Sequence, residues 1–171
     1  CAQGQNELPK LSRKQLKFNS ELLNCGVDIA QLMTGLQQHK CGRLCFYGPP
    51  GTGKTAFGKW LSEELELPII TKRASDLMGP YVGESEKRIA FAFKEAEREG
   101  AVLLIDEVDS FLSSRKGHHM SWETRMVNEL LTQMETFEGI FIASTNLMDN
   151  LDEAAMRRFD MKLHFDYVSS K

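Results

Sequence analysis

From position 43 onward, short apolar runs rich in β-forming residues alternate with longer segments whose apolar residues recur every three or four positions. The short runs predict five strands, at 44–47, 68–73, 102–106, 140–144 and 161–165. The longer segments predict helices at 54–65, 85–99 and 122–137, with a short one at 152–158. Strands that alternate with helices indicate an α/β fold with a parallel sheet.

The run at 102–105 is apolar at every position, which is typical of a central strand covered by helices on both faces. Upstream, residues 1–17 are polar, and Ile29, Leu32, Met33 and Leu36 recur at helical spacing within 18–40. We therefore expect an N-terminal arm and lead-in helix over 1–40, followed by one α/β subdomain over 41–171. Ser85 can cap the helix predicted at 85–99, and Gly100 is expected to end it.

Composition is that of an ordinary globular domain: 171 residues, 42% hydrophobic, 26% charged and a formal net charge of −3. This charge balance does not support nucleic acid as a partner. No apolar run approaches the roughly 20 residues that span a bilayer, so no membrane span is expected.

The four cysteines lack a second pair at zinc-ligand spacing and are interpreted as reduced thiols of a cytoplasmic protein. Because the chain opens on Cys1, we expect it to be a piece of a longer protein.

A glycine-rich segment, GPPGTGKT at 48–55, matches the pattern G-x-x-x-x-G-K-[ST] directly after a predicted strand and before a predicted helix. Gly51 and Gly53 allow successive backbone N–H groups to converge on phosphate oxygens, and the helix start adds further donors. Lys54 is expected to reach the β and γ phosphates, and the Thr55 hydroxyl to bind Mg²⁺. The alternative is a turn that only links strand to helix. The predicted nucleotide contacts are Gly48, Pro49, Pro50, Gly51, Thr52, Gly53, Lys54, Thr55 and Ala56.

Polar residues follow two of the predicted strands, where ligands bind in parallel sheets. Asp106 can hold Mg²⁺, while Glu107 can orient and polarise the water that attacks the γ-phosphate. An acidic strand end also occurs by chance, and the phosphate loop is what favours the catalytic reading here. Asn146 follows the next strand, where its amide can hold the attacking water or a γ-oxygen. Its alternative role is that of a turn residue.

Further motifs lie at 81–87 (YVGESEK), 103–111 (LLIDEVDSF), 128–135 (NELLTQME), 143–146 (ASTN) and 151–160 (LDEAAMRRFD). With the phosphate loop, they make residues 43–165 resemble the AAA ATPases of the AAA+ class, in the group of spastin, katanin and the ESCRT-disassembling ATPase. The resemblance implies the large α/β subdomain of a P-loop NTPase, a five-stranded parallel sheet sandwiched by helices. It also implies ATP and Mg²⁺ as ligands. Because the sequence stops at Lys171, the family's helical lid is not expected in this chain.

The resemblance also implies site roles. Glu107 corresponds to the catalytic carboxylate, Asp106 to the magnesium residue and Asn146 to sensor 1, with Lys54 acting on the phosphates. Arg157 and Arg158 match the arginine fingers, which serve the nucleotide of the neighbouring subunit by neutralising charge on the γ-phosphate. Without the resemblance, a surface helix with two solvated arginines is the favoured reading.

Tyr81, Val82 and Gly83 are similar to the family's pore loop, in which an aromatic side chain grips extended polypeptide. The stretch at 113–121 corresponds to a second pore loop. Tyr81 alone is equally compatible with a loop residue packed on its own domain.

These resemblances imply ATP hydrolysis by a ring of identical subunits, expected to be a hexamer, that remodels or threads a protein substrate. The alternative is a nucleotide-gated assembly scaffold with slow hydrolysis. A kinase or GTPase is disfavoured, because Glu107 beside Asp106 suits water activation and no Asn-Lys-x-Asp motif follows a strand.

Overall fold

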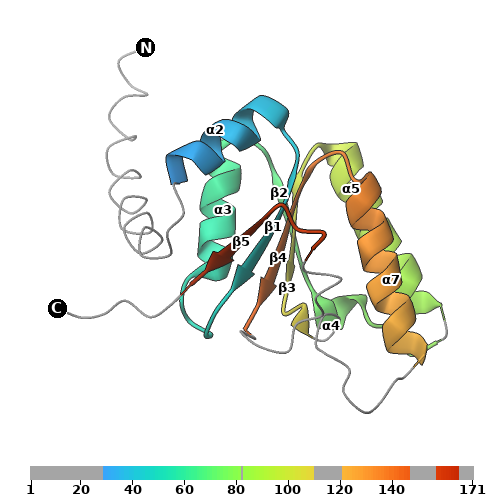
Figure 1. The fold of residues 1–171 in the computed structure, drawn as a ribbon. Helices are drawn as coiled ribbons and strands as arrows, with labels where there is room; N and C mark the ends of the chain where they lie inside the picture. The colour runs from blue at the N-terminus through green and yellow to red at the C-terminus, as the bar shows by residue number, and fades with distance from the viewer. Residues whose placement is uncertain (1–28, 82, 110–120, 147–156, 166–171) are drawn as a thin grey trace.

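A parallel sheet lies between two layers of helices in the computed structural model, which describes residues 29–81, 83–109, 121–146 and 157–165 (Figure 1). Helices α2 and α3 cover one face of the sheet, and α5 and α7 cover the other. The elements are α2 (Ile29–His39), β1 (Gly42–Tyr47), α3 (Lys54–Glu64), β2 (Ile69–Arg73), α4 (Ala74–Leu77), α5 (Glu84–Glu99), β3 (Val102–Asp106), α7 (Ser121–Thr136), β4 (Ile140–Thr145) and β5 (Met161–His164).

The sheet has five parallel strands in the order β2-β3-β4-β1-β5, which confirms the predicted fold class. Strand β1 pairs with β4 and β5, so the segment that follows β1 leaves from the interior of the sheet. Strand β3 pairs with β2 and β4. The carboxyl ends of β1, β3 and β4 therefore meet at one edge, where the sequence places its polar residues.

The core consists of two clusters, one on each face of the sheet. Alternate residues of β4 separate them: Ile140 and Ile142 pack with α2 and α3, whereas Phe141 and Ala143 pack with α5 and α7. The apolar residues of β3 are fully buried, as expected for a strand with helices on both sides.

Several predicted boundaries change. Helix α5 begins at Glu84, and its N-cap is Gly83 in a left-handed conformation, so the prediction of a Ser85 cap is wrong. The Ser85 hydroxyl instead accepts a hydrogen bond from the Gly79 amide at 2.9 Å. The sequence does not predict the short helix α4, because four residues carry no periodic signal. Gly100 ends α5 with a positive φ, as expected.

Three predicted features lie partly or wholly outside the described residues: the N-terminal arm, the second pore loop and most of the helix at 152–158. Arg157 and Arg158 lie in a turn. No helix within the described ranges is long and apolar enough to cross a membrane.

The two described cysteines are free thiols: Cys41 is exposed and Cys45 is buried in β1. Burial raises the pKa of Cys45 to about 12, because the thiolate would lose its hydration. In the part of the chain that the structure describes, no group of three or more His, Cys, Asp or Glu residues is placed to hold a metal ion.

Candidate functional site

The glycine-rich loop joins the end of β1 to the start of α3 and lines a pocket of about 310 Å³. Gly51 and Gly53 have φ angles of 77° and 90°, in the left-handed region that glycine adopts without strain. Gly53 is also the N-cap of α3 and makes no side-chain cap bond, so the first N–H groups of the helix remain available as donors. The loop thus has the backbone geometry of an anion cradle.

Lys54 is folded back onto this loop. Its Nζ donates hydrogen bonds to the carbonyl oxygens of Gly48 and Pro49, both at 2.8 Å, and lies 3.4 Å from Thr52 Oγ1. The residue is 5% exposed, and burial lowers the pKa of Lys54, while the negative charges of Asp106 and Asp109 partly offset this effect. The ammonium therefore sits among oxygen acceptors that phosphate oxygens can replace.

Two oxygen-bearing side chains from distant parts of the sequence meet beside this ammonium. Thr55 Oγ1 donates to Asp106 Oδ2 at 3.2 Å, although the two residues are 51 positions apart. A hydroxyl and a carboxylate are hard oxygen donors of the kind that Mg²⁺ prefers. The pair therefore fits the predicted magnesium site.

Glu107 follows Asp106 and lines the same pocket. Its φ of 59° is uncommon for a residue other than glycine, and its amide donates to Asp106 Oδ1 at 2.9 Å. Backbone strain of this kind is concentrated at functional sites, where the surrounding structure holds it. The chain thus leaves β3 sharply and presents an exposed carboxylate beside the phosphate loop.

Asn146 also lines the pocket, directly after β4. Its backbone is held by Asp109, a residue without a predicted role. Asp109 Oδ1 accepts a hydrogen bond from Thr145 Oγ1 at 2.6 Å and another from the backbone N–H of Asn146 at 3.3 Å. The Val108 amide adds a bond to the Ser144 carbonyl at 3.1 Å. Asp109 therefore links the ends of β3 and β4. Its position three residues after Asp106 is the signal that could have identified it.

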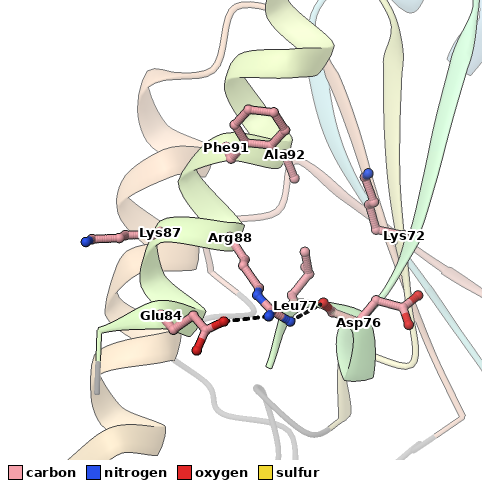
Figure 2. A pocket seen from close by; sticks show the side chains of 8 residues that line it. All are labelled: Lys72, Asp76, Leu77, Glu84, Lys87, Arg88, Phe91 and Ala92. Atoms are coloured by element: carbon pink, nitrogen blue, oxygen red, sulfur yellow. Dashed lines mark hydrogen bonds and ion pairs between the residues drawn. The ribbon is translucent and has the colours of Figure 1, made fainter. Parts of the chain in front are cut away.

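Tyr81 lies away from this pocket, ahead of α5, and is 77% exposed, which does not fit the alternative of a ring packed on its own domain. Its amide donates to Glu84 Oε2 at 3.3 Å, and Glu84 Oε1 pairs with Arg88 at 2.6 Å. Figure 2 shows Arg88 reaching from α5 toward α4, where it donates to the carbonyls of Asp76 and Met78. The first two turns of α5 thus brace the loop that carries Tyr81, beside a hollow of about 490 Å³.

Arg157 and Arg158 are the predicted catalytic residues that the fold does not bring to the pocket. They precede the amino end of β5, whereas the pocket lies at the carboxyl ends of the strands. Arg158 pairs with Glu135 near the end of α7, and nearby Asp160 bonds to Arg43 at the start of β1. The two arginines therefore lie at the opposite edge of the sheet from their own chain's pocket. Val82 lies outside the described residues.

Comparisons with known proteins identify the family of this chain. The family described as "ATPase family associated with various cellular activities (AAA)" matches residues 44–167. The AAA domain-containing protein FIGL1 of Arabidopsis thaliana is 39% identical over 136 residues, covering 75% of this chain and 20% of the relative. Spastin of Ixodes scapularis is 36% identical over 155 residues, covering 85% of this chain and 23% of the relative.

A solved structure is also similar: the FIGL-1 AAA domain in complex with ADP, with a TM-score of 0.62 and 32% identity. The match covers 73% of this chain and 43% of that one. The chain thus spans about a quarter or less of the length of these two full-length relatives. Because the family match covers most of the sequence, this chain belongs to the AAA family of ATPases.

Proposed function

We propose that this chain binds ATP with Mg²⁺ and hydrolyses it as the α/β subdomain of a ring-forming AAA ATPase. The observation that carries the proposal is the meeting of Lys54, Thr55, Asp106, Glu107 and Asn146 around one pocket at the carboxyl edge of the sheet. Membership of the AAA family supports ATPase activity, and the free thiols are in keeping with a reducing compartment such as the cytoplasm.

Each side chain has a task that follows from its position. The loop amides and Lys54 bind phosphate oxygens, with the ammonium exchanging its carbonyl acceptors for them. Thr55 and Asp106 hold Mg²⁺, which supplies neutralising charge when bound. Glu107 accepts a proton from the attacking water, and the Asn146 amide orients that water or a γ-oxygen. Together these tasks make up an ATP hydrolase site.

Arg157 and Arg158 act in trans in this proposal, because the fold holds them away from their own pocket. A guanidinium from a neighbouring chain neutralises charge on the γ-phosphate in the transition state. For this role, Arg158 must release its ion pair with Glu135 and bind the phosphate instead. Repeating one such head-to-tail contact around an axis closes a ring, which we propose to be a hexamer.

Hydrolysis by the wild-type chain tests this arrangement. Phosphate release should require Mg²⁺, cease in EDTA, be slow in dilute solution and rise per chain with protein concentration. Mixing an Arg157→Ala, Arg158→Ala double variant with Glu107→Gln should restore part of the activity, because each lacks what the other supplies. Fast hydrolysis that is independent of concentration would contradict action in trans.

A substitution at Tyr81 distinguishes a remodelling ATPase from a nucleotide-gated scaffold. In the intact protein, Tyr81→Ala should leave ATP hydrolysis unchanged, weaken binding of a fluorescently labelled unfolded polypeptide about 10-fold and abolish its processing, because an exposed aromatic ring supplies the grip. Fluorescence anisotropy measures the binding. The control is Phe91→Ala, which removes another large exposed apolar side chain of the described residues, 58% exposed on α5. Unchanged processing in Tyr81→Ala would favour the scaffold.

A further inference from the structure

The hydroxyl of Ser144 is buried without a hydrogen-bond partner in the described part of the chain. The residue is 0% exposed. The other buried hydroxyls each have a partner there: those of Thr52, Ser62, Ser85 and Thr145. Because a buried hydroxyl that makes no hydrogen bond destabilises a protein, its presence in a strand interior calls for a partner from outside the described chain.

The position of Ser144 in the sheet indicates where that partner comes from. Residues two apart in a strand point to the same face, so Ser144 shares the face of Ile142, which packs with α3. On β3, Asp106 shares that face with Leu104 for the same reason. Ser144 is also the direct register partner of Asp106 on the neighbouring strand.

Ser144 therefore lies next to Asp106 on the side of the sheet that faces the phosphate loop. It lines the pocket formed with Lys54, Thr55 and Glu107. Thr145 points to the other face, where its hydroxyl bonds to Asp109. Of these two adjacent hydroxyls, one is thus used within the fold, and the other faces the pocket and has no partner among the described residues.

We propose that the Ser144 hydroxyl is a ligand-contacting group of the nucleotide site. It hydrogen-bonds an oxygen of the bound magnesium–nucleotide complex beside Asp106, either a phosphate oxygen or a water molecule held by the ion. This proposal rests on the proposed function, because it takes the occupant of the pocket to be a nucleotide. It adds to the phosphate loop and the acidic pair a residue that lies within the motif at 143–146 but has no assigned role.

Equilibrium binding of a fluorescent ATP analogue to Ser144→Ala and to wild type tests the proposal. Loss of one neutral hydrogen bond should weaken binding about 3- to 10-fold in the presence of Mg²⁺. The matched control is Ser62→Ala, a buried serine of α3 whose hydroxyl bonds to the Lys59 carbonyl at 2.7 Å. This control should bind the nucleotide like wild type.

Thermal unfolding of the nucleotide-free variants supplies a second measurement, in which the two substitutions should differ. Ser144→Ala should unfold at the same temperature as wild type or higher, because it removes a hydroxyl that has no partner in the part of the chain that the structure describes. Ser62→Ala should unfold at a lower temperature, because it loses a hydrogen bond. A clear drop for Ser144→Ala would mean that the hydroxyl has a structural partner in the fold, and would overturn the proposal.

Three binding conditions distinguish the source of the oxygen: the ATP analogue with Mg²⁺, the same analogue in EDTA, and the matching ADP analogue with Mg²⁺. A loss confined to the two Mg²⁺ conditions identifies a water molecule on the ion, and a loss that persists in EDTA identifies a phosphate oxygen. Equal binding by Ser144→Ala and wild type in all three overturns the proposal. If wild type itself binds neither analogue, the proposed function fails instead.

Discussion

Replacing Glu107 by glutamine is expected to leave ATP bound and to slow its hydrolysis about 100-fold or more, since the carboxylate that accepts the proton from water is lost. The amide keeps the size of the side chain and removes only its basicity. The phosphate contacts come from the loop and Lys54, so the affinity for ATP should stay within a few-fold of wild type. Phosphate release and equilibrium nucleotide binding measure the two effects separately.

Glu138→Gln is the matched control for this variant. Glu138 is an exposed glutamate that precedes β4, at the edge of the sheet opposite the pocket. The same change of charge there should leave both turnover and affinity unchanged. Turnover of Glu107→Gln close to that of wild type would refute the role of Glu107 as the base, whereas a loss of binding without a loss of turnover would indicate a role in holding the nucleotide.

Gly48→Ala is expected to lower the free energy of unfolding by roughly 3 kcal/mol or more, because it combines a backbone clash with an unfavourable φ. A Cβ at this position would lie 1.9 Å from the carbonyl oxygen of Phe165, and the φ of Gly48 is 150°. The neighbouring backbone cannot easily move away, since the Phe165 amide donates to the Tyr47 carbonyl at 2.8 Å and Gly48 itself bonds to Thr145. Urea denaturation measures the change.

The control for this variant is Gly35→Ala in α2. A Cβ at Gly35 meets no atom of the described residues within 4 Å, so alanine there should raise the free energy of unfolding by about 0.5–1 kcal/mol through its higher helix propensity. The two glycine substitutions should therefore have opposite signs. A Gly48→Ala variant as stable as wild type would show that β1 and β5 can separate at this point without cost.

Local pattern was sufficient to predict the phosphate loop, its flanking strand and helix, and the five strands. The loop at 48–55 is short, and its glycines, lysine and threonine occupy the positions that the phosphate-loop pattern requires within that segment. The buried strand at 102–105 was equally clear, because both faces of a covered strand must be apolar. These features depend on neighbours along the chain, which the sequence displays directly.

Where the same kind of reasoning failed, a distant contact decided the outcome. Ser85 has the composition of a helix cap, yet Gly83 takes that position and Ser85 holds the Gly79 amide. Arg157 and Arg158 are a different case: their predicted service to a neighbouring subunit stays a prediction, and the fold adds that they lie at the opposite edge from their own pocket.

The sequence by itself thus determined the phosphate-loop pattern, the strands and the polar residues that follow them. The tertiary structure decided how those strands are ordered, and hence that Asp109 holds the end of β4, that Gly48 meets the backbone after β5 and that Ser144 lies beside Asp106. The physical reason is that the order β2-β3-β4-β1-β5 brings together residues far apart in the chain. Their packing and hydrogen bonds leave no periodic trace in a linear pattern of apolar and polar positions.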